Sequence, residues 1–273
     1  ELDRLEELGV INKINCSEWV APIVLAPKEG KNEIRLCIDL RSLNANIIVD
    51  RHPLPNISEM INLIHDAKFF SVLDLSSAHH QIALHKDSQD LTSFTTPLGN
   101  YMFCRLPFGL ASAAGVFQRI MQHVLRDINK TLCFQDDILI HGSSEQEHDE
   151  TLFAVLCRLR KAGLTIKKEK CKIGVTSVEY LGHTISSEGI KPKLSLVEAI
   201  KKAPPPASKE EVKSFLGLAE YMSKFVPNFS ELVSPIRETL KKNVSFECKE
   251  EQVKAFGKIK TAIANVPVLG NLM

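Results

Sequence analysis

Two adjacent aspartates, Asp136 and Asp137, interrupt an apolar stretch that has the composition of a buried strand. The stretch reads Thr131-Leu-Cys-Phe-Gln-Asp-Asp-Ile-Leu-Ile-His141. A carboxylate in such a stretch is unfavourable unless it is paired, hydrogen-bonded or bound to a metal ion. Because neighbouring carboxylates repel each other, we expect them at a tight turn between two short strands, where a divalent cation neutralises them. The doublet indicates an enzyme that handles phosphates with metal ions.

A third acid, Asp74, lies in a second apolar strand pattern that runs from Phe69 to Leu75. The intervening chain is long enough for this strand and the doublet's strand to lie side by side in one sheet. That arrangement would gather the three acids around two cations roughly 3.5–4 Å apart. Taken alone, Asp74 is better explained as a cap of the following helix, and it is the doublet that favours a metal site.

The spacing of apolar residues predicts an α+β chain. Strand patterns occupy residues 20–27, 33–40, 69–75, 91–96, 101–106 and 131–140, with a further hairpin over 177–190. Helical patterns occupy 56–64, 112–125 and 145–162, and then 193–202, 208–225, 228–240 and 249–265. Mixed elements therefore come first and helices alone follow, which predicts a domain boundary near residues 187–192.

Composition excludes several classes of protein. The 273 residues are 44% hydrophobic, and no apolar run is long enough for a membrane-spanning helix. The net charge of +1 gives no signal for nucleic acid by itself. The segment 158–172 is nevertheless strongly basic, either as a solvated helix end or as a surface that follows a phosphate backbone. The seven cysteines lack zinc-site spacing, and we expect small buried hydrophobes in a reducing compartment.

Five stretches occur in the order and spacing found in reverse transcriptases. They are Trp19–Val24 with Arg35–Asn44, Phe70–Ile82, Leu106–Leu110 with Phe117-Gln118, Phe134–Ile140, and Tyr180–Ser186. Downstream, Ser214–Tyr221 and Pro267–Leu269 also fit. The chain thus resembles the reverse transcriptases of long-terminal-repeat retrotransposons, most closely those of the Ty3/Gypsy group.

The resemblance implies a right-hand polymerase fold, α+β, with a helical continuation. Fingers and palm would occupy residues 1–187, a thumb-like helical segment 188–245, and the truncated start of a connection toward an RNase H domain 246–273. The absence of an initiator Met suggests a piece of a Pol polyprotein, which in full would also carry RNase H and integrase domains. Family resemblance further implies an intracellular location, in a cytoplasmic virus-like particle, and no membrane partner.

The implied activity is RNA-directed DNA polymerisation. The enzyme would extend a primer 3′ end on an RNA or DNA template with dNTPs, using two Mg²⁺ ions, with Mn²⁺ as a possible substitute. By resemblance, the metal ligands and catalytic acids are Asp74, Asp136 and Asp137, and Lys170 would protonate the leaving pyrophosphate.

Other site residues follow from the same resemblance. The residues implied for nucleotide binding are Lys28, Arg35, His79, Phe108 and Gly109. The residues implied for a primer grip are Tyr180, Leu181, Gly182 and His183. Gln118 is assigned a supporting position only.

The chain departs from the family pattern at informative positions. Phe134 replaces a tyrosine, Gln135 fills a slot that is often apolar, and His79 stands where a larger aromatic ring blocks a ribose 2′ hydroxyl. Residues 112–115 replace Asn-Ala-Pro-Ala with Ser-Ala-Ala-Gly, which predicts a less rigid loop.

Two alternatives remain open at this point. A decayed copy would bind nucleic acid without polymerising. A phospho-acceptor signalling domain would also use an acid cluster, but it needs regular β-α alternation, and the hairpin patterns argue against it.

Overall fold

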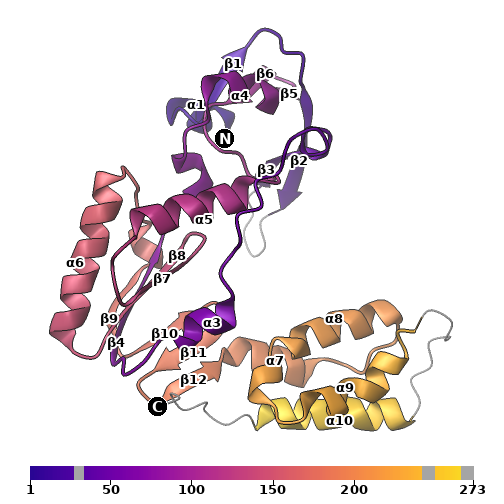
Figure 1. Ribbon diagram of the computed structural model, residues 1–273. Helices are drawn as coiled ribbons and strands as arrows, with labels where there is room; N and C mark the ends of the chain where they lie inside the picture. The colour runs from indigo at the N-terminus through magenta and orange to yellow at the C-terminus, as the bar shows by residue number, and fades with distance from the viewer. Residues whose placement is uncertain (28–33, 242–249, 266–273) are drawn as a thin grey trace. The chain divides into compact units, whose positions relative to one another are not determined.

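The computed structural model describes residues 1–27, 34–241 and 250–265. The chain forms two compact units (Figure 1). The first unit comprises residues 1–61, 71–141 and 146–173, and the second comprises 62–70, 142–145 and 174–273.

The helices and strands have the following bounds. The strands are β1 (Ile11–Ile14), β2 (Ala21–Pro27), β3 (Ile34–Ile38), β4 (Phe69–Asp74), β5 (Phe94–Thr96), β6 (Gly99–Phe103), β7 (Thr131–Phe134), β8 (Asp137–Gly142), β9 (Lys172–Val175), β10 (Ser177–Tyr180), β11 (His183–Ser186) and β12 (Gly189–Pro192). The α-helices are α1 (Leu2–Glu7), α2 (Arg41–Asn44), α3 (Ile57–Asn62), α4 (Lys86–Gln89), α5 (Ala113–Val124), α6 (Glu145–Lys161), α7 (Leu194–Lys202), α8 (Lys209–Glu220), α9 (Phe229–Glu238) and α10 (Glu250–Ala264). Short 3₁₀ turns include η1 (Ala78–Gln81), η3 (Lys168–Lys170) and η4 (Ser223–Phe225).

A five-stranded sheet of order β1-β6-β5-β2-β3 lies at the N-terminal end of the first unit. Its β2–β3 hairpin was predicted from sequence and is confirmed by the antiparallel register Val24↔Cys37. Aromatic rings from β5 and β6 fill its core, where Phe94, Tyr101 and Phe103 pack together with Ile11. The remainder of the unit is built on a different sheet.

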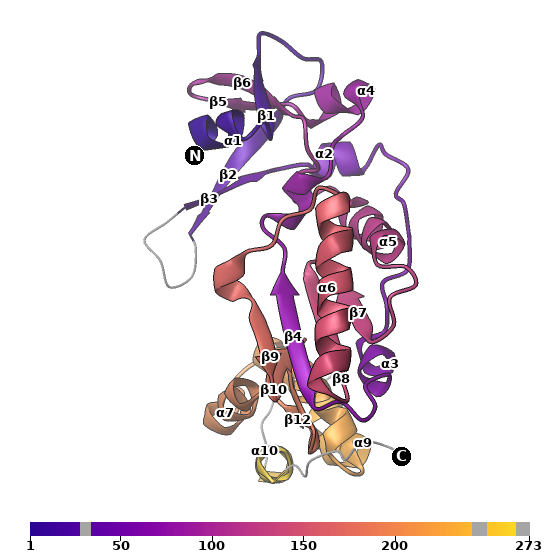
Figure 2. The same ribbon diagram turned by 90° about the vertical axis from the view of Figure 1, so that its left-hand side faces the viewer.

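The second sheet has the strand order β7-β8-β4-β9. Alternate apolar residues of β4 and β8 face helices α5 and α6 and form one buried core with them. Figure 2 shows the two helices beside this sheet. The apolar spacing of α6 predicts that Leu152, Val155, Leu156 and Leu159 face inward. This is confirmed, because Val155 and Leu159 are buried and Leu152 and Leu156 pack against the same core. This core fixes the ends of β4 and β8, which carry the candidate acids.

The second unit combines a three-stranded antiparallel sheet, β10-β11-β12, with helices α7 to α10. The four predicted helices are confirmed within two or three residues, apart from the end of the second, which stops at Glu220 and continues as η4. Ser208 caps α8, since its side chain accepts a hydrogen bond from the Glu211 amide. In return, the Glu211 carboxylate accepts one from the Ala207 amide.

Three expectations from the sequence were wrong in whole or in part. The hairpin predicted over residues 177–190 is confirmed for β11 and β12, which turn at Ser186–Gly189. It is preceded by a further strand, β10, because Leu181 and Gly182 make a tight turn inside the predicted first strand. The sequence also suggests Ser112 as the cap of the helix over 112–125. Ser112 precedes α5 but its side chain does not cap it, and its hydroxyl instead accepts a hydrogen bond from the Asp50 amide at 3.0 Å. The six cysteines within the described residues are free thiols, and each is either partly buried or exposed rather than fully buried.

Among the described residues, we find no helix that is both long and apolar enough to cross a bilayer.

Candidate active site

The Asp136-Asp137 doublet lies at a two-residue hairpin turn, as its sequence predicts. Phe134 at the end of β7 pairs with Asp137 at the start of β8, and Gln135 and Asp136 connect them. Gln135 has a φ of 54°, a left-handed conformation that residues other than glycine rarely adopt. Asp136 is exposed and Asp137 is partly buried. The turn therefore presents both carboxylates at the end of a buried hairpin.

Two glutamine side chains hold this strained turn. Gln118 of α5 is fully buried, donates to the Cys133 carbonyl at 2.9 Å and accepts from the Gln135 amide at 2.8 Å. The Gln135 side chain donates to the Ala114 carbonyl at 3.1 Å. These hydrogen bonds satisfy buried backbone groups and attach the turn to α5, which gives Gln118 a larger structural part than the sequence indicated. The available signal was a polar residue on the apolar face of a helix.

Asp74 ends β4, the strand next to β8, as the separation of the two patterns predicted. The Leu75 amide donates to the Asp136 carbonyl oxygen at 3.2 Å, so the end of β4 adjoins the doublet's turn. On the other side, the Lys167 amide donates to the Asp74 carbonyl oxygen at 2.8 Å. The Asp74 carboxylate forms an ion pair with Lys170, with a Nζ–Oδ2 distance of 2.7 Å. Lys170 is thus brought to the acids from a distant part of the sequence.

The charges at this edge of the sheet interact strongly. Burial raises the pKa of Asp137, and repulsion from Asp136 and Asp74 raises it further, while Lys170 opposes the shift. The hydrogen bond to Asp74 raises the pKa of Lys170, so that its ammonium stays protonated at neutral pH. Three carboxylates with one nearby ammonium leave excess negative charge, which attracts cations.

The acids do not converge on a single point as they stand. In the part of the chain that the structure describes, no three His, Cys, Asp or Glu side chains are arranged to hold a metal ion. Asp74 is instead engaged with Lys170. For all three acids to bind one cation, the Asp74 carboxylate would have to release Lys170 and contact the cation instead.

His79, Phe108 and Gly109 lie in the same unit as the acids. The His79 ring packs against Phe108 and Phe117, with centroid distances of 4.8 Å and 5.3 Å. Burial lowers the pKa of His79, against the opposing effects of Asp136 and of a hydrogen bond with Gln135. Phe108 is 55% exposed, so much of its side chain remains accessible to solvent next to His79.

The loop that carries Gly109 is held by Asn44, a residue whose role the sequence did not reveal. The Asn44 side chain donates to the Gly109 carbonyl at 2.9 Å and accepts from the Ala111 amide at 2.8 Å. Gly109 has a φ of 90°, which explains why glycine stands there. Arg35 lies in β3 opposite Ala26, whereas Lys28 lies outside the described residues.

The Ser-Ala-Ala-Gly substitution has a different consequence from the one predicted. Residues 113–115 form the first turn of α5 rather than a loose loop. A Cβ atom at Gly115 would lie 3.0 Å from the Asp50 carbonyl oxygen, so the glycine permits close packing. Arg119 forms an ion pair with Asp50 at 2.6 Å, and His52 hydrogen-bonds Gln122 at 2.8 Å. The segment before α3 therefore braces the helix that holds the doublet.

The predicted primer-grip residues form a turn in the second unit. Tyr180 of β10 pairs with His183 of β11, and Leu181 and Gly182 connect them with φ angles of 43° and 72°. Two consecutive left-handed residues are typical of a type I′ turn. Tyr180 and His183 are buried.

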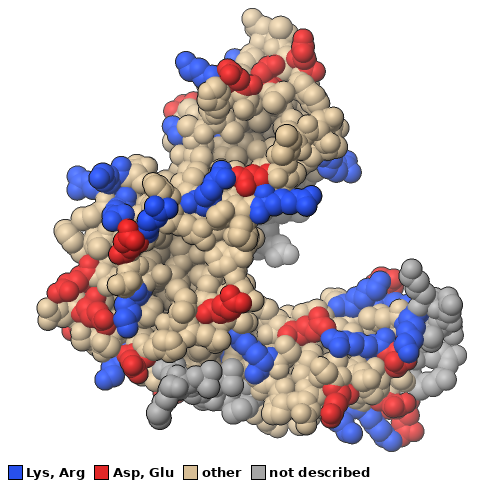
Figure 3. All heavy atoms as spheres, in the orientation of Figure 1, with Lys and Arg blue, Asp and Glu red and all other residues tan. Residues whose placement is uncertain are grey.

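The basic segment 158–172 lies on the surface of the first unit. Its basic residues are all exposed: Arg158, Arg160, Lys161, Lys167, Lys168, Lys170 and Lys172. On the face shown in Figure 3, basic side chains gather near the C-terminal end of α6, whereas acidic and basic side chains are interspersed over α7 to α10. The concentration of positive charge is local to the end of α6 and the turn that follows it.

Comparison with known proteins decides the family. The family model described as reverse transcriptase (RNA-dependent DNA polymerase) matches residues 26–185. The chain belongs to the reverse transcriptase family. This confirms the resemblance seen in the sequence motifs.

The relatives are retrotransposon polyproteins. The chain is 35% identical over 268 residues to the retrovirus-related Pol polyprotein from transposon 297 of Drosophila melanogaster, covering 96% of this chain and 25% of the relative. It is 35% identical to the Pol polyprotein from transposon gypsy of the same organism, covering 98% of this chain and 28% of the relative. The Tf2-3 polyprotein of Schizosaccharomyces pombe is 31% identical and matches 98% of this chain. The chain spans about a quarter of the length of the first two of these relatives.

Solved structures support the predicted fold. The foamy viral protease-reverse transcriptase in complex with double-stranded DNA has a TM-score of 0.92 and 25% identity, covering all of this chain and 57% of that one. A second structure, of the same enzyme's dRH form with double-stranded DNA, has a TM-score of 0.93 and covers 98% of this chain and 48% of that one. The chain therefore has the right-hand polymerase fold of reverse transcriptases, with mixed helices and antiparallel sheets, as expected from the motifs.

Proposed function

We propose that this chain is the RNA-directed DNA polymerase part of a retrotransposon Pol polyprotein. It would extend a primer 3′ end on an RNA or DNA template with dNTPs, and would act beside RNase H and integrase domains in the full polyprotein, inside a cytoplasmic particle. The observation that carries the proposal is the placement of Asp74, Asp136 and Asp137 at adjoining strand ends, with Lys170 beside them. Family membership and fold support it.

The proposed cofactors are two Mg²⁺ ions, held by Asp74, Asp136 and Asp137. Carboxylate oxygens are the donors that Mg²⁺ prefers. The raised pKa of Asp137 supports the fit, because its causes are burial and repulsion from the negative charges of Asp136 and Asp74. When bound, the ions would supply charge neutralisation and a lowered pKa for the primer 3′ hydroxyl.

The protein's own groups would position and protonate the reactants. Lys170 keeps its proton through the hydrogen bond with Asp74, and would deliver it to the pyrophosphate leaving group once that bond opens. Phe108 and Gly109 would form the floor of the nucleotide pocket, and His79 would lie beside the sugar. Arg35 and Lys28 would contact the triphosphate. The turn from Tyr180 to His183 would hold the primer end.

The test is primer extension by the purified chain with Mg²⁺, on RNA and DNA templates. Asp136→Asn and Asp137→Asn should each lower the rate by more than roughly 100-fold, because the metal ions supply several kcal/mol of charge stabilisation. Asp127→Asn, at an exposed position with a φ of 66° that asparagine tolerates, is the matched control and should extend normally. Template binding without any extension by the unmodified chain would favour the decayed-copy alternative instead.

A further inference from the structure

The β10–β11 turn of the second unit is contacted by the side chain of Tyr221, which follows α8. Its hydroxyl donates a hydrogen bond to the Leu181 carbonyl oxygen and lies 3.1 Å from His183 Nδ1. His183 Nδ1 is in turn 2.6 Å from the same carbonyl. Because a carbonyl oxygen only accepts, Nδ1 carries the ring proton and donates it there. One carbonyl thus receives two donors.

The Tyr221 ring also packs directly over the turn. A Cβ atom added at Gly182 would lie 2.7 Å from the Tyr221 hydroxyl oxygen and 3.0 Å from two of its ring carbons. The ring lies 5.2 Å from that of His183, centroid to centroid, and His183 also packs against Phe225 of η4 at 5.8 Å. Glycine at position 182 is therefore required both by its left-handed backbone and by the ring above it.

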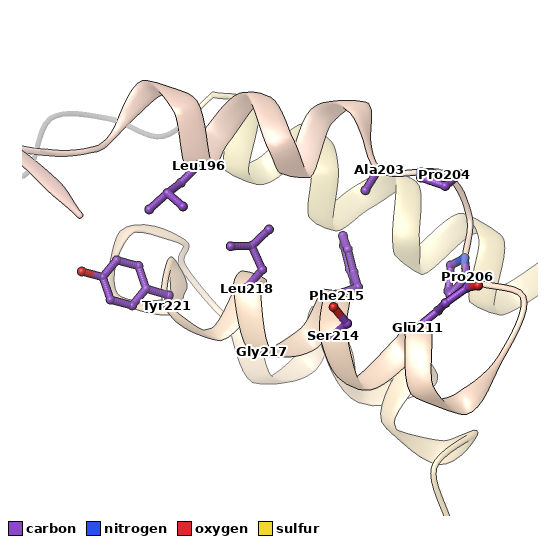
Figure 4. A pocket seen from close by; sticks show the side chains of 10 residues that line it. All are labelled: Leu196, Ala203, Pro204, Pro206, Glu211, Ser214, Phe215, Gly217, Leu218 and Tyr221. Atoms are coloured by element: carbon purple, nitrogen blue, oxygen red, sulfur yellow. The ribbon is translucent and has the colours of Figure 1, made fainter. Parts of the chain in front are cut away.

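The other side of Tyr221 borders an apolar groove between α7 and α8. This groove has a volume of about 710 Å³. Figure 4 shows Tyr221 at one end, with its hydroxyl pointing away from the other lining residues. Gly217 lines the same groove, and a Cβ atom there would meet no atom within 4 Å. The Tyr221 hydroxyl therefore hydrogen-bonds the turn, while the side chain also lines the groove.

We propose that Tyr221 is a positioning residue that fixes the Leu181-Gly182 turn to the end of α8, so that the primer 3′ end moves with the helical segment. This inference rests on the proposed function, because it assumes that the turn contacts the primer. The hydrogen bond, the close packing over Gly182 and the contact with His183 all hold the turn from the same side. The turn also has a second anchor, since the Lys193 amide before α7 donates to the Gly182 carbonyl at 3.0 Å.

The decisive variant is Tyr221→Phe, which keeps the ring and removes only the hydroxyl. Amide hydrogen exchange across residues 181–184 should become faster. Primer extension should lose about five- to tenfold in kcat, the equivalent of one hydrogen bond. The KM for dNTP should not change, because the proposed nucleotide residues are not part of this contact. Tyr101→Phe is the control, because it removes the hydroxyl of a buried tyrosine in the first unit.

A pair of glycine variants tests the packing independently of activity. Gly182 and Gly163 have φ angles of 72° and 70°, but only Gly182 has Tyr221 above it, and a Cβ at Gly163 would meet nothing within 4 Å. Gly182→Ala should therefore lose more stability than Gly163→Ala in urea denaturation. Equal losses would contradict a close contact between the ring and the turn.

The outcomes separate this inference from the proposed function. If the unmodified chain extends primers and Tyr221→Phe matches its kcat, or shows unchanged exchange over residues 181–184, the inference is overturned and the polymerase proposal stands. If the unmodified chain extends no primer under Mg²⁺ or Mn²⁺, the polymerase proposal is overturned and the primer-positioning role with it. A selective loss of kcat with faster exchange supports the inference.

Discussion

The Phe134–Asp137 turn of the first unit and the Tyr180–His183 turn of the second are both two-residue connections with left-handed backbone. Each is held by a side chain from a helix or its end. In the first turn the holding groups are amides, from Gln118 and from Gln135 itself. In the second, an aromatic ring and its hydroxyl perform the same task.

The difference follows from what each turn exposes. The first turn bears Asp136 and Asp137, the residues that the proposed metal ions have to reach. Hydrogen bonds to backbone atoms on the buried side hold it without covering the carboxylates. The second turn bears no charge, so a ring can pack over Gly182 and bury His183. Each strained turn is thus stabilised by the kind of contact that suits the side chains it carries.

The largest effect on stability should come from removing the two hydrogen bonds that the Gln118 side chain makes to the first turn, which we call the amide clamp. Gln118→Leu leaves the Cys133 carbonyl and the Gln135 amide without their partner, at about 1–3 kcal/mol for each unsatisfied buried group. Urea denaturation should therefore show a loss of roughly 2–5 kcal/mol. Gln122→Leu on the same helix removes only an exposed hydrogen bond to His52, and should change stability by less than about 1 kcal/mol. Similar losses in both variants would contradict the clamp.

The second turn should be the more sensitive to acid. Burial, together with the nearby Lys224 ammonium, lowers the pKa of His183 from 6.5 to about 4. The unfolded chain takes up this proton below about pH 6.5, whereas the folded ring resists it, so stability falls as pH falls between 6.5 and 4. The loss at pH 4 is at most about 3 kcal/mol. Amide exchange over residues 181–184 at several pH values measures it, and His183→Phe should remove the pH dependence there.

Alanine substitution of one glycine in α5 and one in α8 should change stability in opposite directions. Gly115→Ala in α5 would press a methyl group to 3.0 Å from the Asp50 carbonyl oxygen, and we expect a loss of about 1–3 kcal/mol. Gly217→Ala in α8 meets open space and should gain up to about 1 kcal/mol from helix propensity. Thermal unfolding of both variants checks this. A stabilised Gly115→Ala protein would disprove the tight packing of α5.

His79 tests whether the first turn also shapes substrate choice. His79→Tyr should enlarge the ring beside the proposed sugar site and raise the preference for dNTP over rNTP by about tenfold, since steric discrimination of this kind is worth one to a few kcal/mol. Single-nucleotide insertion with matched dNTP and rNTP measures the ratio. His123→Tyr, on the exposed side of α5, is the control. An unchanged ratio would remove His79 from sugar selection.

The smallest effect concerns the ion pair between Lys170 and Asp74, next to the first turn. Lys170→Met removes the ion-pair partner of the Asp74 carboxylate. The affinity for Mn²⁺, measured by calorimetry, should rise by about two- to fivefold, which corresponds to the loss of a partly exposed ion pair. Primer extension should slow at the same time, because the proposed proton donor is gone. Weaker Mn²⁺ binding would contradict competition between Lys170 and the cation for Asp74.

Local patterns predicted much of the fold because they are read over a few neighbouring residues. The β2–β3 hairpin, the doublet's hairpin and the helices of the second unit follow from periodicity and turn residues. The Leu181-Gly182 turn was missed because Leu181 has a large apolar side chain, and such residues are typical of strands rather than turns. The role of Gly115 was misread for a different reason. The Asp50 carbonyl oxygen that it packs against is distant in sequence, so the local pattern gives no sign of this contact.

By itself, the sequence determined the family, the order of the elements and the three acids, because motif residues and their spacing are written along the chain. Only the tertiary structure decided which side chains hold those elements in place. The bonds of Gln118 to the doublet's turn, of Asn44 to the Gly109 loop and of Tyr221 to the Leu181 carbonyl join residues far apart in sequence. The physical reason is that these contacts depend on packing between elements, and a linear pattern carries no information about which distant backbone group will need a partner.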